Sequence, residues 1–426
     1  MRQPADRVIG CEYEALIQDR NGSTVPYDGP NGIKSCLEYL RDHFDWNPIC
    51  EEEYLIALER DSRRGDLTRP GGIQSVTLEP GGQFEMSGAP LARLAHVQSE
   101  LEAHVEELKQ VEDDLGVRAR WFGLNPWQST DEIQWMPKQR YGVMKRYLPT
   151  QGRLAHYMMG LTCTVQCNLD YTDEADFAFK LKMSTGVSPL VNALFANSPI
   201  YSGKNTGWKS YRSRIWHEVD PARCGLHRFV FDTDAGFDDY IEWALDIPMF
   251  FVVRDGIYVD MTNRGTFRDL KDGRISGMKA TLADWKLHLS TLFPEVRARP
   301  HLEFRSADVV PPNMINSCPA LWVGLVYDEN AAQYAWDLVK GFSFSERLDL
   351  WSDCAHYALE APIPGRRGHV FDLANDLVQI AQEGLQNLSA AGLGDANDEQ
   401  FLAPLREILA NRRTRADRIL AGEIRI

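Results

Sequence analysis

The sequence lacks an excess of positive charge, since 46 Lys and Arg stand against 61 Asp and Glu and leave a net charge of -15. Nucleic acids and anionic membranes require clustered cationic surface, so neither is expected as a main partner. No apolar run approaches the roughly 18 residues that a membrane span needs. The N-terminal segment MRQPADRVIG shows neither a signal peptide's apolar core nor a transit peptide's pattern. We therefore expect a cytoplasmic protein that acts on small molecules, as a monomer or a homodimer.

The chain also lacks the usual cysteine and nucleotide motifs. Its eight cysteines are dispersed and include no CxxC pair, and Cys163 and Cys167 lie in an alternating apolar pattern that favours buried, reduced thiols. There is no GxxxxGKS/T P-loop, no kinase motif set and no GxGxxG segment that opens a helix. A nucleotide, if one is bound, must use another kind of site.

What is present is organised around residues 75–90, SVTLEPGGQFEMSGAP. A short extended run ends at Glu79, breaks at Pro80-Gly81-Gly82 and resumes toward Glu85. Proline favours extended geometry in the residue before it, and glycines allow a tight turn or a close approach. Because Gln83, Glu85 and Ser87 alternate with apolar residues, we expect two strands whose carboxylates flank a glycine turn. The alternative is a surface hairpin with solvated glutamates.

Four other stretches show the same alternation, at residues 7–18, 161–171, 210–216 and 301–305, and each is expected to form a strand. Each stretch carries a pair of polar side chains on one face. Taken singly, such a pair more often lies on a solvated strand face, but several pairs on one sheet would form a concave polar surface. The polar pairs on these stretches are Glu12 and Glu14, Gln166 and Asn168, Arg212 and Arg214, and Glu303 and Arg305.

Helical periodicity marks the remaining chain. Apolar residues at three- and four-residue steps predict helices over 90–116, over 173–196 and, from Cys318 onward, over most of the C-terminal part. The charged run 60–72 is expected to be an exposed loop. Without repeats or low-complexity linkers, we expect one α+β catalytic domain over 1–426, with a core at 7–328 and a helical C-terminal part at 329–426.

The density of glutamates on these faces indicates a metal. Buried carboxylates repel one another unless cations compensate them, and the arginines are too few to do so alone. Hard oxygen ligands select Mg²⁺ or Mn²⁺. Carboxylate-bound Mg²⁺ beside arginines is suited to the phosphates of ATP, so the pattern predicts ATP-dependent activation of an anionic substrate.

Several long strings carry a family resemblance. They are SVTLEPGGQFEMSGAPL (75–91), MPKQRYGVMKRYLP (136–149), TCTVQCNLDY (162–171), LFANSPIYSGKNTG (194–207), YRSRIW (211–216), ALDIPMFF (244–251), FPEVRARPHLEFRSAD (293–308) and PALWVGLVYD (319–328). In these strings the sequence resembles glutamate-cysteine ligases of the plant and proteobacterial type, within the glutamine synthetase-like carboxylate-amine ligases.

The resemblance implies a glutamine synthetase-like fold, an antiparallel sheet curved into a funnel and surrounded by helices. It also implies that ATP phosphorylates the γ-carboxylate of L-glutamate and that the amine of L-cysteine attacks the γ-glutamyl phosphate, the first step of glutathione-type thiol synthesis. Under this resemblance Mg²⁺ would be held by Glu12, Glu14, Glu79, Glu85, Gln166 and Glu303. Arg212 and Arg305 would be catalytic and would bind the glutamate carboxylate. The substrate site would also include Arg214, Trp216 and Tyr141, and the nucleotide would contact Lys138 and Arg140.

Two departures from the family pattern leave the amine acceptor open. Leu161 stands where the family usually has Arg before TCTVQ, and SADVVPPNMIN at 306–316 replaces GADGGPWRR. The alternatives are a γ-glutamyl ligase of a specialised pathway that uses another amine, and a non-catalytic homologue that binds amino acids.

Overall fold

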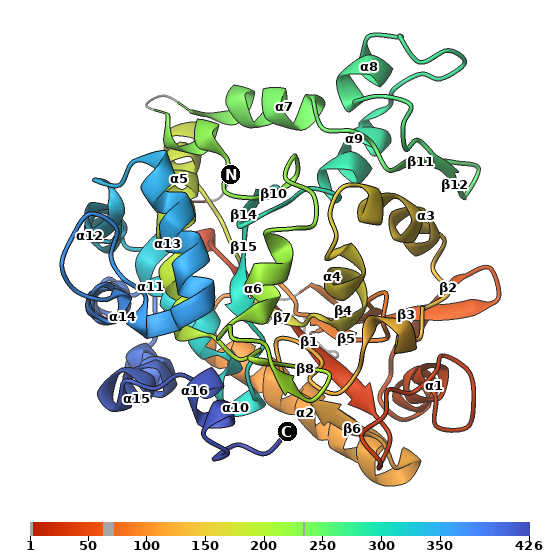
Figure 1. The fold of residues 1–426 in the computed structure, drawn as a ribbon, viewed down its shortest axis with the longest axis horizontal. Helices are drawn as coiled ribbons and strands as arrows, with labels where there is room; N and C mark the ends of the chain where they lie inside the picture. The colour runs from red at the N-terminus through yellow and green to blue at the C-terminus, as the bar shows by residue number, and fades with distance from the viewer. Residues whose placement is uncertain (1–2, 63–71, 233–234) are drawn as a thin grey trace.

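The computed structural model describes residues 3–62, 72–232 and 235–426, so most of the loop expected at 60–72 lies outside the described residues. The described chain builds one nine-stranded sheet in the order β14-β15-β7-β1-β5-β4-β3-β2, with β6 paired to β1 (Figure 1). All of its pairings are antiparallel, and the sheet is not closed. Its strands are β1 (Ile9–Gln18), β2 (Asn47–Glu51), β3 (Tyr54–Asp61), β4 (Ile73–Leu78), β5 (Phe84–Ser87), β6 (Arg118–Arg120), β7 (Thr164–Leu169), β14 (Val296–Ala298) and β15 (Leu302–Asp308).

Strand β1 lies at the centre of the sheet, between β5 and β7. Its alternation is the one that the sequence predicts: Cys11 and Tyr13 are buried on the face that packs against helices, while Glu12 and Glu14 point to the other face. Successive side chains of a strand point to opposite faces. The sheet therefore has an apolar face and a polar face.

Helices cover the apolar face. These are α1 (Ile33–His43), α2 (Leu94–Leu115), α5 (Glu174–Leu194) and α11 (Ser317–Val326). The packing is tight, since the ring of Trp322 on α11 stacks on Phe304 of β15 with centroids 4.3 Å apart. Helix α2 ends as predicted at Gly116, whose φ of 69° is left-handed and suits glycine. The predicted helix over 173–196 also forms, with Asp173 accepting a hydrogen bond from Asp176 N.

The polar face is lined by α3 (Gln139–Tyr147), α4 (Ala155–Leu161) and α6 (Tyr211–Trp216). The strand expected at 210–216 is wrong, because this stretch forms α6. Ser210 caps that helix by accepting from Ser213 N, and Arg212 and Ile215, three residues apart, share its buried side. Six residues are too few to separate period two from period 3.6.

Several shorter elements lie in the upper part of Figure 1. Strands β11 (Phe251–Arg254) and β12 (Ile257–Asp260) form a hairpin whose turn is Asp255-Gly256. The same region holds α7 (Phe237–Leu245), α8 (Phe267–Lys271) and α9 (Leu282–Leu289). The remaining short strands are β8 (Ile200–Tyr201), β9 (Lys204–Asn205), β10 (Cys224–Gly225) and β13 (Phe293–Pro294). A small second apolar cluster, which includes Met249, Val252 and Phe267, holds part of this region together.

The C-terminal part is helical, as predicted. It comprises α10 (Pro312–Ile315), α12 (Glu329–Val339), α13 (Phe344–Tyr357), α14 (Val370–Ala390), α15 (Ala403–Asn411) and α16 (Arg415–Leu420). One hydrophobic cluster runs from Ile9 in β1 to Ile419 in α16 and joins these helices to the sheet. Over the described ranges, none of the helices combines the length and the apolar character that a membrane crossing requires.

Candidate active site on the polar face of the sheet

Strand register brings the polar side chains together. Glu12 lies opposite Ser87 of β5 on one side and Gln166 of β7 on the other, and Glu14 lies opposite Glu85. Glu303 of β15 lies opposite Asn168. All of these pairs occupy the polar face, which forms the floor of a cavity of about 370 Å³. Residues that are far apart in the sequence thus meet because alternate positions of neighbouring strands share a face.

Three glutamates converge at one end of the cavity. Carboxylate oxygens of Glu14, Glu79 and Glu85 lie within 4.8 Å of one another. Burial, with Glu79 and Glu85 nearby, raises the pKa of Glu14 well above its usual range. Burial and Glu79 raise the pKa of Glu85 to about 7. Three clustered carboxylates that repel one another are the donor set that a divalent cation would stabilise.

A tight turn places Glu79 in this cluster. The turn is closed by hydrogen bonds from Glu79 N to Gln83 O and from Gly82 N to Glu79 O, both 2.9 Å long. A Cβ on Gly81 would lie 2.2 Å from the carbonyl oxygen of Gly160, so only glycine fits there. Gly82 has a φ of 85°, in the left-handed region. The glycine pair in the sequence therefore has both a steric and a conformational cause.

Glu12 links the glutamate cluster to the next group of residues. Its carboxylate accepts hydrogen bonds from Asn168 at 2.7 Å and from Gln166 at 3.4 Å. Burial, Glu303 and Glu85 raise its pKa to about 8. The Oδ1 atom of Asn168 is buried and has no hydrogen-bond partner among the described residues.

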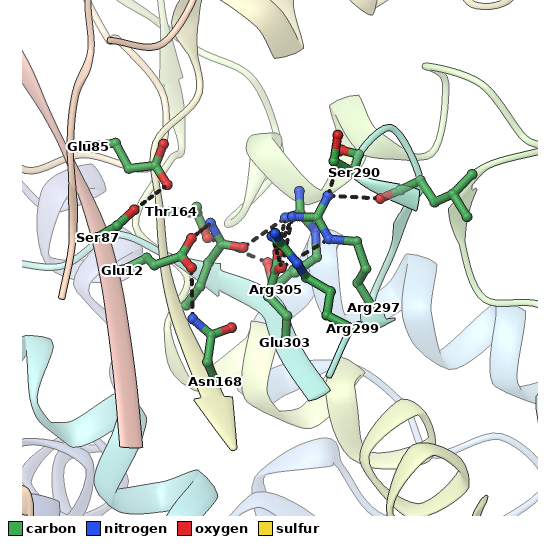
Figure 2. A network of polar contacts seen from close by, with 12 residues as sticks. Glu12, Glu85, Ser87, Thr164, Asn168, Ser290, Arg297, Arg299, Glu303 and Arg305 are labelled. Atoms are coloured by element: carbon green, nitrogen blue, oxygen red, sulfur yellow. Dashed lines mark hydrogen bonds and ion pairs between the residues drawn. The ribbon is translucent and has the colours of Figure 1, made fainter. Parts of the chain in front are cut away.

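Glu303 has a different environment, because three arginines surround it (Figure 2). Arg297 binds both of its carboxylate oxygens, at 2.7 and 2.8 Å, while Arg305 lies at 2.5 Å and Arg299 at 3.5 Å. Although burial opposes ionisation, these arginines hold the pKa of Glu303 well below its usual range. In the described structure Glu303 therefore orients guanidinium groups, and it lies outside the cluster of Glu14, Glu79 and Glu85.

The two arginines predicted to be catalytic lie together in the cavity wall. Arg212 is buried, lines the cavity and donates to the backbone oxygen of Arg305 at 2.9 Å. The NH1 atom of Arg305 also donates to Gln166 Oε1 at 2.8 Å. Asp308, buried beside Arg212 at 3.9 Å, accepts from Ser198 and Ser210. Arg212 is thus held from the side opposite the cavity.

The remaining predicted residues divide into two groups. Lys138, Arg140, Tyr141 and Trp216 all line the cavity. Lys138 donates to Leu78 O at 2.8 Å and Tyr141 to the same oxygen at 2.5 Å, which fixes α3 against the strand before Glu79. Arg214 is not among the lining residues, since its guanidinium pairs with Glu218 and lies 5.3 Å from the Trp208 ring centroid.

Sequence reasoning missed part of the wall. Arg297 in β14 and Arg299 just after that strand line the cavity, and Met144, Met158 and Met159 line it from α3 and α4. The arginines had a signal: they alternate with Ala298 immediately before the Glu303 strand, in the spacing of a hairpin. The methionines had none, because helical apolar residues usually belong to the core.

Known proteins are similar to this chain over nearly its whole length. The family model of glutamate-cysteine ligase family 2 matches residues 8–425. Glutamate--cysteine ligase B, chloroplastic, of Oryza sativa subsp. japonica is 38% identical over 416 residues, covering 97% of this chain and 79% of the relative. The corresponding Medicago truncatula enzyme is 38% identical over 415 residues, covering 97% and 77%.

Solved structures are similar in fold. The glutamate--cysteine ligase of Francisella tularensis in complex with AMP has a TM-score of 0.58 at 12% identity, with 98% of this chain and 84% of that chain covered. A bifunctional glutathione synthetase from Pasteurella multocida has a TM-score of 0.56 at 11% identity, with 98% and 50% covered. The family match over nearly the whole chain, together with the identity to the plant enzymes, shows that this chain belongs to glutamate-cysteine ligase family 2.

Proposed function

We propose that the chain ligates the γ-carboxylate of L-glutamate to the amine of L-cysteine at the expense of ATP, through a γ-glutamyl phosphate. The observation that carries this proposal is the convergence of Glu14, Glu79 and Glu85 with Arg212 and Arg305 in one cavity. The family and the names of its relatives support the same reaction. The product would enter glutathione-type thiol synthesis.

Mg²⁺, or Mn²⁺ in its place, fits the residues present. The glutamate cluster offers three carboxylates that repel one another, and Glu12 and Gln166 extend it with further oxygen donors. A bound divalent ion would neutralise charge on the phosphates of ATP. Glu303 is the remaining candidate ligand, and in that role it would have to share its carboxylate with the three arginines.

The arginines supply positive charge for the substrate. Arg305 and Arg212 present guanidinium groups that bind a carboxylate or a phosphate oxygen in fixed geometry. Lys138 and Arg140, at the start of α3, lie on the glutamate-cluster side and would meet the nucleotide phosphates. Around them, Trp216, Phe293 and the three methionines limit the access of water. An acyl phosphate needs this protection because water would hydrolyse it.

The departures from the family pattern do not add a polar group to the cavity. Leu161 is fully buried in the apolar core and is not a lining residue. In the 306–316 segment, Asp308 supports Arg212 from behind. The cavity therefore retains its charged groups, and cysteine remains the first acceptor to test.

Phosphate release from purified protein with Mg-ATP, L-glutamate and a panel of amines tests the proposal. Release that depends on both L-glutamate and L-cysteine supports it. If phosphate is released only with another amine, the protein is a γ-glutamyl ligase with a different acceptor. If no amine causes phosphate release, the protein is a non-catalytic homologue that binds amino acids.

Gel filtration and cell fractionation would test our further proposals of a monomer or homodimer and of a cytoplasmic location.

A further inference from the structure

A second cavity lies in the C-terminal part of the chain and shares no lining residue with the catalytic cavity. Its volume is about 510 Å³, and it lies between α10, α15 and α16, which Figure 1 shows together near the C-terminus. Pockets of this size accommodate small organic ligands. Neither the reaction nor the family match assigns a role to it.

The charged lining of this cavity favours an anion. Three arginines, Arg413, Arg415 and Arg418, face two acids, Glu407 and Glu423. Glu423 is already paired with Arg413 at 2.6 Å and lies 3.6 Å from Arg418. Arg415 has no carboxylate within ion-pairing distance among the residues that the structure describes, and its Nε donates to the amide oxygen of Asn197 at 3.1 Å. Arg415 and Arg418 both line the cavity, and guanidinium groups bind carboxylate or phosphate oxygens in a defined geometry.

The electrostatics of Arg415 agree with that geometry. Burial and the nearby Arg418 lower its pKa to about 10. The guanidinium remains charged at neutral pH, but its charge is less stabilised there than in water. A bound anion would reverse this effect, because an opposite charge a few ångströms away favours the charged form.

A chain of contacts leads from this cavity to the catalytic one. Asn197, which accepts from Arg415, donates its backbone N–H to Asp308 at 2.8 Å. Asp308 in turn lies 3.9 Å from Arg212. Helix α16 is also tied to this segment, since Ala416 N donates to Ala196 O at 3.0 Å. A ligand that moves Arg415 would act on the residues that hold Arg212.

We propose that this cavity is a regulatory site for a small oxyanion, a carboxylate or a phosphate, which binds at Arg415 and Arg418 and acts on Arg212 through Asn197 and Asp308. The binding is independent of the proposed function. Only the effect on Arg212 rests on the proposed ligase activity.

Methionine methyl signals can report on both cavities in one spectrum of the full chain. Met314 lines the arginine cavity, whereas Met144, Met158 and Met159 line the catalytic cavity. Protein labelled with ¹³C at the methionine methyls would be titrated with inorganic phosphate and, separately, with succinate, the signal of Met314 being assigned with Met314→Leu. We expect a saturable shift of Met314 with at least one anion, and the responding anion identifies phosphate or carboxylate as the ligand chemistry.

Two variants and a control test the assignment. Arg415→Gln should raise the midpoint for Met314 at least about tenfold, while Arg425→Gln, an exposed residue outside the lining, should leave it unchanged. If Arg415→Gln fails to fold, Arg418→Gln, which removes an exposed guanidinium, takes its place. An unmoved Met314 signal, or equal midpoints in wild type and the cavity variant, would overturn the site.

The coupling has its own measurement. The anion that shifts Met314 should change the KM for glutamate at least about fivefold in wild type and in Arg425→Gln, but not in Arg415→Gln. Equal responses in all three proteins would overturn the coupling. If the protein shows no turnover at all, the proposed ligase function fails, whereas the Met314 titration still decides whether the anion site exists.

Discussion

At the scale of single residues, Glu79 and Glu303 have opposite neighbours, and only Glu79 lines the cavity, since Glu303 is fully buried. Glu79 lies against two other carboxylates, whereas Glu303 lies against three guanidinium groups. In a metal-free protein the first arrangement is repulsive and the second is attractive. The same substitution should therefore have opposite effects on stability at the two positions.

Replacing Glu79 by Gln removes one charge from a repulsive cluster and one oxygen ligand from the proposed metal site. We expect turnover at saturating Mg²⁺ to fall at least about 100-fold, as the loss of a ligand from a metal site implies. The melting temperature in EDTA should stay unchanged or rise. Steady-state kinetics and thermal unfolding of the same sample check both, and a variant with full activity would remove Glu79 from the ligand set.

Replacing Glu303 by Gln leaves Arg297 and its neighbours without their counter-charge. Breaking a buried ion pair by removing one partner costs roughly 3 to 5 kcal/mol. The sequence alone groups Glu303 with the metal ligands and predicts no such loss. Chemical denaturation in EDTA measures the change, and Glu423→Gln, an exposed glutamate that pairs with Arg413, is a matched control expected to cost about 1 kcal/mol or less.

The glutamates themselves could be selected from the sequence because carboxylates alternating with apolar residues near a glycine turn are unusual. The partners of Glu303 could not, since which arginine reaches it depends on the register of β14 against β15. Arg214 is a residue that the sequence wrongly assigns to the site. Once residues 211–216 are helical, Arg212 and Arg214 no longer share a face, and only Arg212 lines the cavity.

At the scale of elements, the turn between β4 and β5 sets the position of Glu79. Gly81→Ala would force a Cβ to within 2.2 Å of Gly160 O, so one of the two backbones must move. We expect a loss of about 1 to 3 kcal/mol in stability, typical of overpacking, and a larger proportional loss of activity.

A glycine of α3 that does not line the cavity provides the control for that substitution. Gly142 lies within α3, and the nearest atom to its added Cβ would be 3.7 Å away. Gly142→Ala should be neutral or stabilise the protein by up to about 1 kcal/mol through helix propensity. Equal losses in both variants, by denaturant titration and initial rates, would contradict the steric argument.

Long elements were predictable for a physical reason. Helices α2 and α5 each repeat their apolar spacing over more than five turns, and β1 alternates over ten residues. Short ones were not: the apolar run at 121–127 contributes only an isolated bridge at Leu124, beside the three-residue β6. In short segments tertiary contacts outweigh local pattern.

At the scale of the whole molecule, the raised pKa values of Glu12 and Glu85, about 8 and about 7, make metal-free stability depend on pH. Between about pH 4.5 and 8 the folded state holds protons that the unfolded state has lost, so stability falls as pH rises through that window. We expect the melting temperature in EDTA to decline across it. Glu12→Gln should lessen the decline and Mg²⁺ should offset it, whereas a rising curve would contradict the repulsive cluster.

The single large hydrophobic cluster predicts cooperative unfolding of the sheet with the C-terminal helices. Circular dichroism at 222 nm and tryptophan fluorescence should give coincident denaturant transitions. An early, separate loss of helix signal would indicate that residues 329–426 form a unit of their own, and would contradict the one domain that we predict over 1–426.

The position of β1 between two partners has an evolutionary consequence. A one-residue insertion near its start would shift the register by one residue and exchange the two faces of the strand. Glu12 and Glu14 would then point to the apolar face, and Cys11 and Tyr13 to the cavity. Loops can change in length as related sequences diverge, but the pairing register of β1 with β5 and β7 must be kept.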